Sequence, residues 1–512
     1  MVRGLSLLLF VAACSSSANK HEALAKNLLT HARGTSVFGP ASEFVPSEMV
    51  GADGLFGVRA PSECEVSILP GGEDSFAARM DLLARAKHTI RIEALIFTGD
   101  ESGLRVAEVL KQKKAEGVDV RVIVDAVNNA SSQTQWMYFD LRQHGIDVEG
   151  YEALGLQIVN EIPLPLITPR NDPHDPNMRY HEKLWIIDAG TPNAEAVTGG
   201  LNIANEYFRV DPANVKRYWR DQDVLVRGGV IADLTTTFDR NWKHFKDRDE
   251  QRGNLADVAW TAARKLMAKR GPPTIPFARD DELVRSVATI EKRPVARDYQ
   301  ASRCRFFQSR PRLKETFIQQ AYLKLLAAAQ HEVLIANAYF LPTISTRLAI
   351  EEAAARCVRV VILSNGAETS DTPGMNLLAR GYYKALLAIN DSPRVKACKA
   401  GGGVEIWEWL GRQPSVAKQT QGLLHAKYAV VDRKLALVGS YNLDPRSERL
   451  NSESAIVFEN DALAQRLATT FTDQDLSTSR QILAREAATF EQPASIRQRF
   501  EKDLAEIFEG QL

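Results

Sequence analysis

The sequence contains two segments that repeat each other at a constant spacing. Residues 88–97 read HTIRIEALIF and residues 331–340 read HEVLIANAYF, an offset of 243 (331 − 88). Both are rich in β-branched, aromatic and apolar residues, which is typical of buried strands. Each is followed by apolar residues at helical spacing and then by a second strand-like run. This order predicts two similar α/β halves, each with parallel strands joined by a right-handed crossover.

A second repeated feature carries charged side chains. Residues 181–188 read HEKLWIID and residues 425–432 read HAKYAVVD, an offset of 244 (425 − 181). Glycine-containing turns and an asparagine follow each, in GGLN at 199–202 and GSYN at 439–442. A single H-x-K pattern is a weak signal, because it occurs on many surface strands. The same pattern at matching repeat positions indicates two halves of one site.

Residue parity separates the roles within each motif. Residues two apart in a strand share a face, so each histidine projects together with its lysine. The aspartate lies seven residues after the histidine and projects to the opposite face of a regular strand. We therefore expect the histidines and lysines to act on one ligand and the aspartates to have a structural role. The candidate catalytic motif residues are His181, Lys183, Asp188, His425, Lys427 and Asp432.

These residue types suit a phosphodiester. Lysine is a compact cation for a phosphate oxygen, and asparagine amides add donors where glycine lets the backbone approach. One neutral imidazole can attack phosphorus while the other, protonated, supplies a proton to the leaving oxygen. The expected chemistry needs no metal and no cofactor. The expected phosphate-binding residues are Asn202, Asn442, Ser440 and Gly200.

Two acidic residues are candidates for orienting the imidazoles. Asp221 in YWRDQDVLV and Glu453 in RLNSESAIVF each lie in or just before an apolar strand after their own motif. Either carboxylate could accept a hydrogen bond from the distal ring nitrogen of a motif histidine. The alternative is a pair of solvated carboxylates at strand edges. The run NDPHDPN at 171–177 is interpreted as a loop rather than as a metal site, because of its proline and asparagine.

The composition argues against one class of partner. Sixty-four Lys and Arg balance 64 Asp and Glu, so the formal net charge is zero. Proteins that bind duplex nucleic acid usually carry a basic excess to neutralise phosphates. We therefore expect no nucleic-acid partner.

The N-terminal segment indicates export. Arg3 precedes an apolar run that ends in VAAC, and this run is too short to span a bilayer. VAAC resembles the lipobox of bacterial lipoproteins, which implies lipidation at Cys14 and a membrane-anchored lipoprotein of the cell envelope, on its periplasmic face. Ser15 resembles the type sorted to the outer membrane. The alternatives are an ordinary signal peptide and a start codon placed too far upstream.

Four other cysteines bear on the same question. Export permits disulfides, but the pairing of Cys64, Cys304, Cys357 and Cys398 cannot be deduced from their spacing. Cys357 lies between a predicted helix and a predicted strand, and we expect it to be a buried, inert thiol.

The repeats also predict the domain boundaries. We expect a signal segment, a first motif-bearing domain, a polar and proline-bearing linker, a second motif-bearing domain and a helical tail that packs on the second domain. Their ranges are 1–14, 30–250, 251–300, 301–470 and 471–512.

The paired motifs resemble the phospholipase D superfamily, which is named for two H-K-D motifs. GSYNLDPRSERLNSE at 439–453 and GGLNIANEYF at 199–208 resemble the motifs of bacterial cardiolipin synthases, especially the C-type group. The resemblance implies two phospholipase D-like α/β/α sandwich domains related by a pseudo-two-fold axis. It also implies mixed, largely parallel sheets and an active site at the domain interface. Arg446 carries over as a motif residue without a settled role.

The resemblance also implies a reaction. His181 would attack a phospholipid phosphorus to form a phosphatidyl-histidine, and His425 would protonate the leaving alcohol. Phosphatidylglycerol as acceptor would give cardiolipin, whereas water would give phosphatidic acid. The implied partners are phosphatidylglycerol, phosphatidylethanolamine and a membrane surface, to which the apolar stretch 154–169 could bind unless it is a buried lid. A phospholipase D or another phosphodiesterase, a nuclease and a non-catalytic binding protein are the alternatives.

Overall fold

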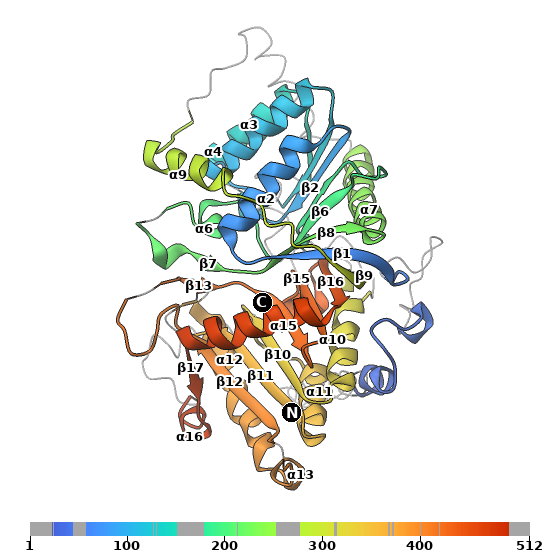
Figure 1. The fold of residues 1–512 in the computed structure, drawn as a ribbon, viewed down its shortest axis with the longest axis vertical. Coiled ribbons are helices and arrows are strands. Elements are labelled where there is room, and N and C mark those ends of the chain that lie inside the picture. The colour runs from blue at the N-terminus through green and yellow to red at the C-terminus, as the bar shows by residue number, and fades with distance from the viewer. Residues whose placement is uncertain are drawn as a thin grey trace, which may run out of the picture.

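The protein is described by a computed structural model (Figure 1). It describes residues 23–44 except 24, 58–150 except 126 and 130, 179–251 except 212, and 277–490 except 312–314, 367–368, 371–372, 400 and 419. The predicted lipidation site, the loop 171–177 and the apolar stretch 154–169 lie outside these residues. No helix among the described residues combines the length and the apolar character needed to cross a bilayer.

Fifteen strands of the described chain form one continuous sheet that runs through both halves of the molecule. The first half contributes β1 (Ser62–Leu69), β2 (Thr89–Ala94), β3 (Asp119–Val124), β4 (Asp147–Glu149), β5 (Leu184–Ile187), β6 (Glu195–Gly199) and β8 (Asp223–Gly228). The second half contributes β9 (Gln300–Ser309), β10 (Glu332–Asn337), β11 (Arg359–Asn365), β12 (Gly403–Trp409), β14 (Lys427–Val431), β15 (Leu435–Gly439), β16 (Glu453–Glu459) and β17 (Ser479–Ile482).

The order of the strands is nearly palindromic. It runs β17-β12-β11-β10-β14-β15-β16-β9-β1-β8-β6-β5-β2-β3-β4. Outward from the antiparallel β1–β9 pair, each strand of one half has a counterpart in the other, and β17 alone is unmatched. The two halves are therefore related by an approximate two-fold axis between β1 and β9. The repeated segments of the sequence fall on the counterparts β2 and β10, as the offset predicts.

The prediction of largely parallel sheets is wrong. Of the 14 pairings in the large sheet, only β2–β3, β3–β4, β10–β11 and β11–β12 are parallel. The strand–helix–strand units at the start of each half do produce these parallel pairs. Each H-K-D motif then forms a hairpin, β5–β6 and β14–β15, which adds antiparallel strands on the inner side of the parallel ones.

Helices cover both faces of the sheet. One face of the first half packs against α2 (Gly72–Arg85), α3 (Glu101–Ala115), α4 (Ser132–Gln143) and α9 (Asp281–Glu291). The corresponding core of the second half involves α10 (Phe317–Ala328), α11 (Ile344–Ala355) and α12 (Pro373–Ala388). A third core contains residues of α7 (Val230–Gln251) and α15 (Asp461–Thr469) and continues through both halves. Short helices α6 (Asn205–Phe208), α13 (Pro393–Lys396), α14 (Pro445–Arg449) and α16 (Ala484–Ala487) lie in the connections.

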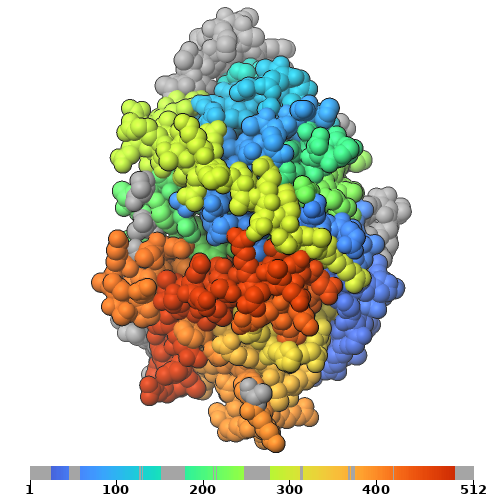
Figure 2. Space-filling view, viewed as in Figure 1, coloured from blue at the N-terminus to red at the C-terminus, as the bar shows by residue number. Residues whose placement is uncertain are grey.

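The boundaries between the parts differ from the expected ones at three places. Residues 30–44, expected with the first domain, pack against the second half (Figure 2), because Ala32, Phe38 and Phe44 join its core. Helix α9, expected in the linker, packs its apolar face on α2 and α3. The expected helical tail includes β17, which pairs with β12 at the sheet edge.

The four cysteines of the described chain form two disulfides. Cys64 on β1 is bonded to Cys304 on β9, so this disulfide joins the two halves beside the pseudo-two-fold axis. Cys357 is bonded to Cys398, 41 residues away. The expectation of a buried, inert thiol at Cys357 is therefore wrong. The left-handed turn at the end of α11, where Cys357 has φ of 69°, places it at the surface and within reach of Cys398.

Candidate active site

Two short strand pairings bring the motifs of the two halves together. Strand β13 (Leu423–Leu424), just before the second motif, pairs with β7 (Trp219–Arg220) of the first half. Tyr180, just before the first motif, forms an equivalent bridge with Ser452 of the second half. The second motif therefore begins beside Arg220, which precedes the candidate acid Asp221. The first motif begins beside Ser452, which precedes the candidate acid Glu453. Figure 1 shows β7 and β13 at the boundary between the halves.

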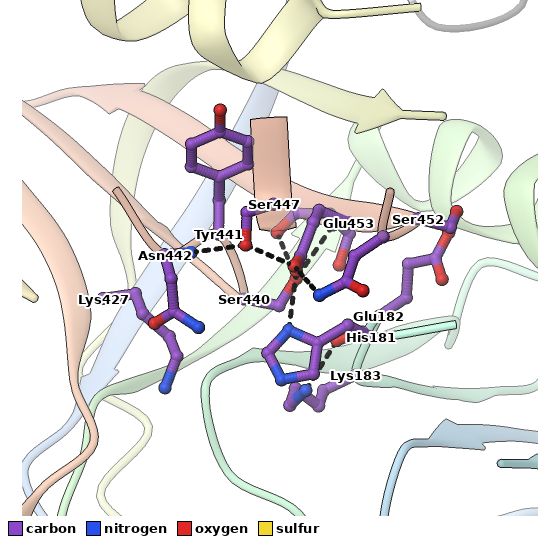
Figure 3. Close-up of polar contacts among 12 residues, drawn as sticks. His181, Glu182, Lys183, Lys427, Ser440, Tyr441, Asn442, Ser447, Ser452 and Glu453 are labelled. Atoms are coloured by element: carbon purple, nitrogen blue, oxygen red, sulfur yellow. Dashed lines mark hydrogen bonds and ion pairs between the residues drawn. The ribbon is translucent and has the colours of Figure 1, made fainter. Parts of the chain in front are cut away.

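Each imidazole is hydrogen-bonded to a carboxylate from the opposite half. Nδ1 of His181 lies 2.8 Å from Oε2 of Glu453 (Figure 3), and Nδ1 of His425 lies 2.5 Å from Oδ2 of Asp221. All four side chains are buried. A carboxylate only accepts hydrogen bonds, so it holds the ring hydrogen on Nδ1 and leaves Nε2 available for chemistry. The candidate acids therefore lie where orienting groups are needed, and each completes the other half's motif.

The two motif lysines lie directly behind the histidines. Lys183 Nζ donates a 2.6 Å hydrogen bond to the carbonyl oxygen of His181, and Lys427 Nζ donates in the same way to that of His425. Both lysines are 1% exposed. Two ammonium groups are thus buried beside two imidazoles, which is a strong local field for an anion.

The motif aspartates lie at the other end of their strands. Oδ1 and Oδ2 of Asp432 accept from the backbone N–H groups of Gln330, His331 and Glu332 at 2.7–2.9 Å. Asp188 accepts from the corresponding groups of residues 87–89. Each aspartate therefore fixes the start of β10 or β2 and does not contact the imidazoles, as the parity argument expects.

The two candidate asparagines have different surroundings. The amide of Asn202 is engaged, because Oδ1 accepts from the backbone N–H of Ile96 and Nδ2 donates to the Tyr207 hydroxyl at 2.8 Å. Oδ1 of Asn442 is buried and has no hydrogen-bond partner among the described residues. The geometry therefore favours Asn442 over Asn202 as a group that can bind a ligand.

Ser440 and Gly200 contact the acids rather than an open space for phosphate. Ser440 Oγ donates to Oε2 of Glu453 (Figure 3). A Cβ atom at Gly200, the equivalent position, would collide with the carboxylate of Asp221. The serine therefore supplies a hydrogen bond to one acid, and the glycine leaves room for the other.

Several further side chains complete the site. The rings of Tyr207 and Trp219 lie 5.3 and 4.4 Å from the His425 ring, between centroids. Ser447 and Asn451 donate to Oε1 of Glu453 at 2.8 and 3.2 Å. Sequence reasoning did not identify these four. Comparison of the repeats could have flagged Tyr207 and Ser447, because each lies five residues after its motif asparagine.

Burial and the crowding of cations control the ionisation of the site. Burial lowers the pKa of His181 to about 4, although the Glu453 charge opposes this shift, and it lowers the pKa of Lys183 to about 7. Burial, together with the charges of both motif lysines, lowers the pKa of His425 well below its usual value. A phosphodiester anion between the two motifs would raise all three pKa values, because it adds the missing negative charge.

The pKa values of the two orienting acids are shifted in opposite directions. Burial raises the pKa of Asp221 to about 7, and nearby Lys427 offsets only part of that effect. Burial would also raise the pKa of Glu453, but His181, Lys183 and Ser440 together lower it overall. At neutral pH Glu453 is therefore ionised, while Asp221 is close to its titration point.

The remaining predicted motif residue, Arg446, lies near enough to Glu453 for that charge to affect its pKa. Arg446, on α14, is half-buried, and its pKa is lowered by burial and by the charge of Arg179. The described residues contain no group of three or more His, Cys, Asp or Glu side chains placed to hold a metal ion.

The geometry can support covalent phosphoryl chemistry. Two imidazoles with fixed Nδ1 hydrogen bonds and two lysines converge from opposite halves. Such a set can supply a nucleophile, an acid or base and stabilisation of the phosphoryl oxygens.

Comparison with known proteins supports a phospholipid-related family. The family model described as "Cardiolipin synthase, PLD-like domain" matches residues 80–242 and 322–475. The chain is 26% identical over 400 residues to a cardiolipin synthase of Geobacillus thermodenitrificans, covering 78% of this chain and 64% of that protein. It is 27% identical over 416 residues to the major cardiolipin synthase ClsA of Bacillus subtilis, covering 81% of this chain and 69% of that one. The chain therefore spans slightly under two thirds of the first of these relatives.

A solved structure supports the fold independently. Phosphatidylserine synthase from Haemophilus influenzae Rd KW20 superposes with a TM-score of 0.56 at 14% identity, covering 87% of this chain and 95% of that one. The family model covers more than half of the chain and includes both histidines with their acids. The chain belongs to the phospholipase D-like domain family of the cardiolipin synthases.

Proposed function

We propose that the protein is a phosphatidyltransferase that forms cardiolipin through a phosphohistidine intermediate. One observation supports this most: each imidazole is oriented by a buried acid from the opposite half, beside a buried lysine. A binding protein without catalytic activity would have no need for two such imidazole–carboxylate pairs. The relatives named cardiolipin synthase favour a phospholipid as the substrate.

In the proposed first step, Nε2 of His181 attacks the phosphorus of phosphatidylglycerol. The N–P bond forms, the P–O bond to the glycerol head group breaks, and Nε2–H of His425 gives its proton to the glycerol oxygen. In the second step, His425 takes the proton of a hydroxyl on a second phosphatidylglycerol. That oxygen attacks phosphorus and the N–P bond breaks, giving cardiolipin and free His181.

The surroundings of the acids support this assignment of roles. Four side chains donate to Glu453, namely His181, Ser440, Ser447 and Asn451, so its charge is well stabilised and can support a positive imidazole. Asp221 accepts from the side chain of His425 and from the backbone N–H of its neighbour Gln222. A carboxyl close to its titration point suits a histidine that both gives and takes a proton.

One assay tests the function. Purified protein is given phosphatidylglycerol vesicles, with and without phosphatidylethanolamine, and the products are resolved by mass. We expect cardiolipin and free glycerol. Phosphatidic acid alone would instead show a hydrolase with water as the acceptor. No change in any lipid, with cleavage of DNA, would show a nuclease.

Two substitutions test the mechanism. His181→Ala and His425→Ala should each reduce turnover by at least about a thousandfold, because covalent transfer needs both groups. Rapid denaturation at alkaline pH, where the P–N bond is stable, with a 32P-labelled donor should detect phosphohistidine in the wild type and none in His181→Ala. Near-normal turnover in either variant would contradict the two-histidine route.

We also propose that the protein acts in the bacterial cell envelope, anchored to a membrane through lipidated Cys14. Two disulfides in the described chain support an oxidising compartment, since such bonds are rare in the cytosol. Labelling cells with an alkyne fatty acid should mark the wild type and not Cys14→Ala. Recovery of the labelled protein in the cytosolic fraction would contradict the proposal.

A further inference from the structure

Two buried carboxyl groups beside the first motif have no role in the proposed reaction. Glu182 lies between His181 and Lys183 and is 0% exposed, and Glu93 on the neighbouring strand β2 is 1% exposed. The repeat offsets of 244 and 243 place alanines, Ala426 and Ala336, at the equivalent positions of the second half. Because the second half folds in the same way without these carboxyls, the fold itself does not require them.

Glu182 connects the two halves through one of its oxygens. Oε1 accepts hydrogen bonds from Ser452 Oγ at 2.5 Å, Gln308 Nε2 at 2.7 Å and Asn241 Nδ2 at 3.3 Å. Figure 3 shows this side chain turned away from the His181 ring, toward Ser452. Oε2 is buried and has no donor among the described residues, which is costly for a carboxylate oxygen.

Glu93 supplies the missing donor if it carries a proton. Its carboxyl accepts from Asn241 Nδ2 at 2.9 and 3.2 Å, as that of Glu182 does, so the two groups share one amide. Burial raises the pKa of Glu93 well above its usual value, and the charge of Glu182 raises it further. A protonated carboxyl has an O–H to donate, and two buried carboxylates side by side would repel each other.

We propose that Glu93 is protonated and donates to Oε2 of Glu182, and that Glu182 is a positioning residue that holds Ser452 and thereby Glu453 against His181. The charged groups around the pair fit a single negative charge. Lys183 follows Glu182 directly in the sequence. Strand β9 presents the neutral side chain of Gln308, to which Arg240 of α7 donates at 2.6 Å. From the second half, Glu453 follows Ser452 directly.

The equivalent place on the other side of the site has a comparable anchor. Arg220, just before Asp221, is held by a buried ion pair with Asp475, with contacts of 2.9 and 3.0 Å. Ser452, just before Glu453, is held by Glu182. In each case a buried charge fixes the residue that precedes an orienting acid. Glu182 therefore fixes the residue next to the acid that orients His181. Asp475 fixes the residue next to the acid that orients His425.

This inference rests on the proposed function only for its kinetic part. Its test uses three variants, Glu182→Ala, Glu93→Gln and Ser452→Ala. The matched control is Glu149→Gln, which removes another buried carboxylate, one that forms an ion pair with Lys246 at the sheet edge.

The proton on Glu93 is tested without turnover. The infrared difference spectrum at pH 7, wild type minus Glu93→Gln, should contain the carbonyl stretch of one protonated carboxyl group, whereas the wild type minus the control should not contain it. The glutamine amide can still donate to Oε2, so this variant should retain activity within about twofold. An unchanged carboxyl band in Glu93→Gln would overturn the placement of the proton.

The positioning role is tested by kinetics. Glu182→Ala and Ser452→Ala should each lower kcat roughly tenfold to a hundredfold with little change in KM, because a displaced nucleophile still allows substrate to bind. The double variant should be no worse than the poorer single variant, because both substitutions break one connection. A kcat of Ser452→Ala equal to that of the control would overturn the role, even if Glu182→Ala failed to fold.

A second readout separates this inference from the proposed function. In protein labelled with 15N-histidine, the Nδ1–H signal of His181 reports its hydrogen bond to Glu453 without any substrate. That signal should shift in Glu182→Ala and stay unchanged in the control. If the wild type made no cardiolipin, the proposed function would fail. The infrared and histidine signals would still decide the proton and the positioning.

Discussion

Asp188 and Asp432 complete the motifs by which the superfamily is named, and neither contacts the imidazoles. Each leaves its strand with φ of 50° and turns its carboxylate toward three backbone N–H groups at the start of the next strand along the sheet. Parity alone does not produce this placement. His181 precedes β5, so the strand is regular only from Leu184, and the left-handed turn at the aspartate completes the change of direction.

The hydrogen bonds of Asp432 predict that its substitution reduces stability and leaves catalysis largely intact. Asp432→Ala removes three hydrogen bonds to a charged group and should reduce the free energy of unfolding by about 3 kcal/mol, with kcat within about threefold of wild type. Asp432→Asn should cost less, because asparagine accepts hydrogen bonds and tolerates a left-handed conformation. Urea denaturation and kinetics well below Tm measure the two effects. Total loss of kcat in a folded Asp432→Ala protein would show a direct catalytic role.

The two orienting acids predict opposite pH dependences. Because the pKa of Asp221 is raised to about 7 in the folded protein, its stabilising contribution is present below about pH 4 and is lost as the pH rises through 7. Asp221→Asn cannot ionise, so its Tm relative to wild type should be higher at pH 8 than at pH 5. Its turnover should fall roughly 100-fold.

Glu453 is the internal comparison, because its pKa is lowered. Its contribution is present above about pH 4.5 and is lost at lower pH. Glu453→Gln should therefore be less stable than wild type at both pH 5 and pH 8. Thermal unfolding at the two pH values distinguishes the acids, and equal behaviour of the two variants would contradict the assigned ionisation states.

At the scale of single elements, the short pairings β7–β13 and Tyr180–Ser452 matter more than the long strands. They are one or two residues long, yet they place each acid against the other half's histidine. Short pairings are not stable alone, so buried polar anchors hold them in place. On the His425 side the anchor is Asp475, at the end of a π-helical turn (Thr470–Asp475).

This arrangement predicts that Asp475 is essential for stability. Arg220 and Asp475 are 3% and 2% exposed, and Tyr428 also donates to Asp475 at 3.1 Å. Asp475→Ala would leave a guanidinium buried without its carboxylate and should cost about 3–5 kcal/mol of unfolding free energy. The matched control is Asp473→Ala, two residues earlier and exposed, which should change stability by less than about 0.5 kcal/mol. Equal effects in urea denaturation would show that the ion pair is not an anchor.

For the whole molecule, the continuous sheet makes the halves one folding unit. Strands β1 and β9 pair across the pseudo-two-fold axis, the core of α7 and α15 extends through both halves, and each orienting acid belongs to the half opposite its histidine. A site built this way exists only when both halves are assembled.

The disulfides provide a test at this scale. Cys64 and Cys304 are 240 residues apart, against 41 for Cys357 and Cys398. A longer loop restricts the unfolded chain more, so replacing Cys64 and Cys304 by alanine should cost roughly 1.5 kcal/mol more than replacing the other pair. Urea denaturation of the two double variants under oxidising conditions measures this difference. A larger loss from the shorter loop would show that native packing, not chain entropy, dominates.

The sequence by itself determined the duplication, the strand–helix–strand start of each half, the paired motifs and the identity of the candidate acids. These are local or periodic signals, which the chain carries whatever its tertiary contacts. The spacing also predicted that the aspartates and the histidines point in different directions. The left-handed turn at each aspartate, which completes this change of direction, was visible only in the structure.

Only the tertiary structure decided which acid meets which histidine, the antiparallel centre of the sheet and the disulfide pairing. The acid–histidine contacts join residues 204 and 272 positions apart, and the disulfides join residues 41 and 240 positions apart. Spacing alone does not encode such contacts. The same holds for Asn202 and Ser440, whose side chains are used inside the protein by Tyr207 and Glu453. A hydrogen-bonding residue looks the same in a sequence whether its partner is a ligand or a neighbour, and burial determines which it is.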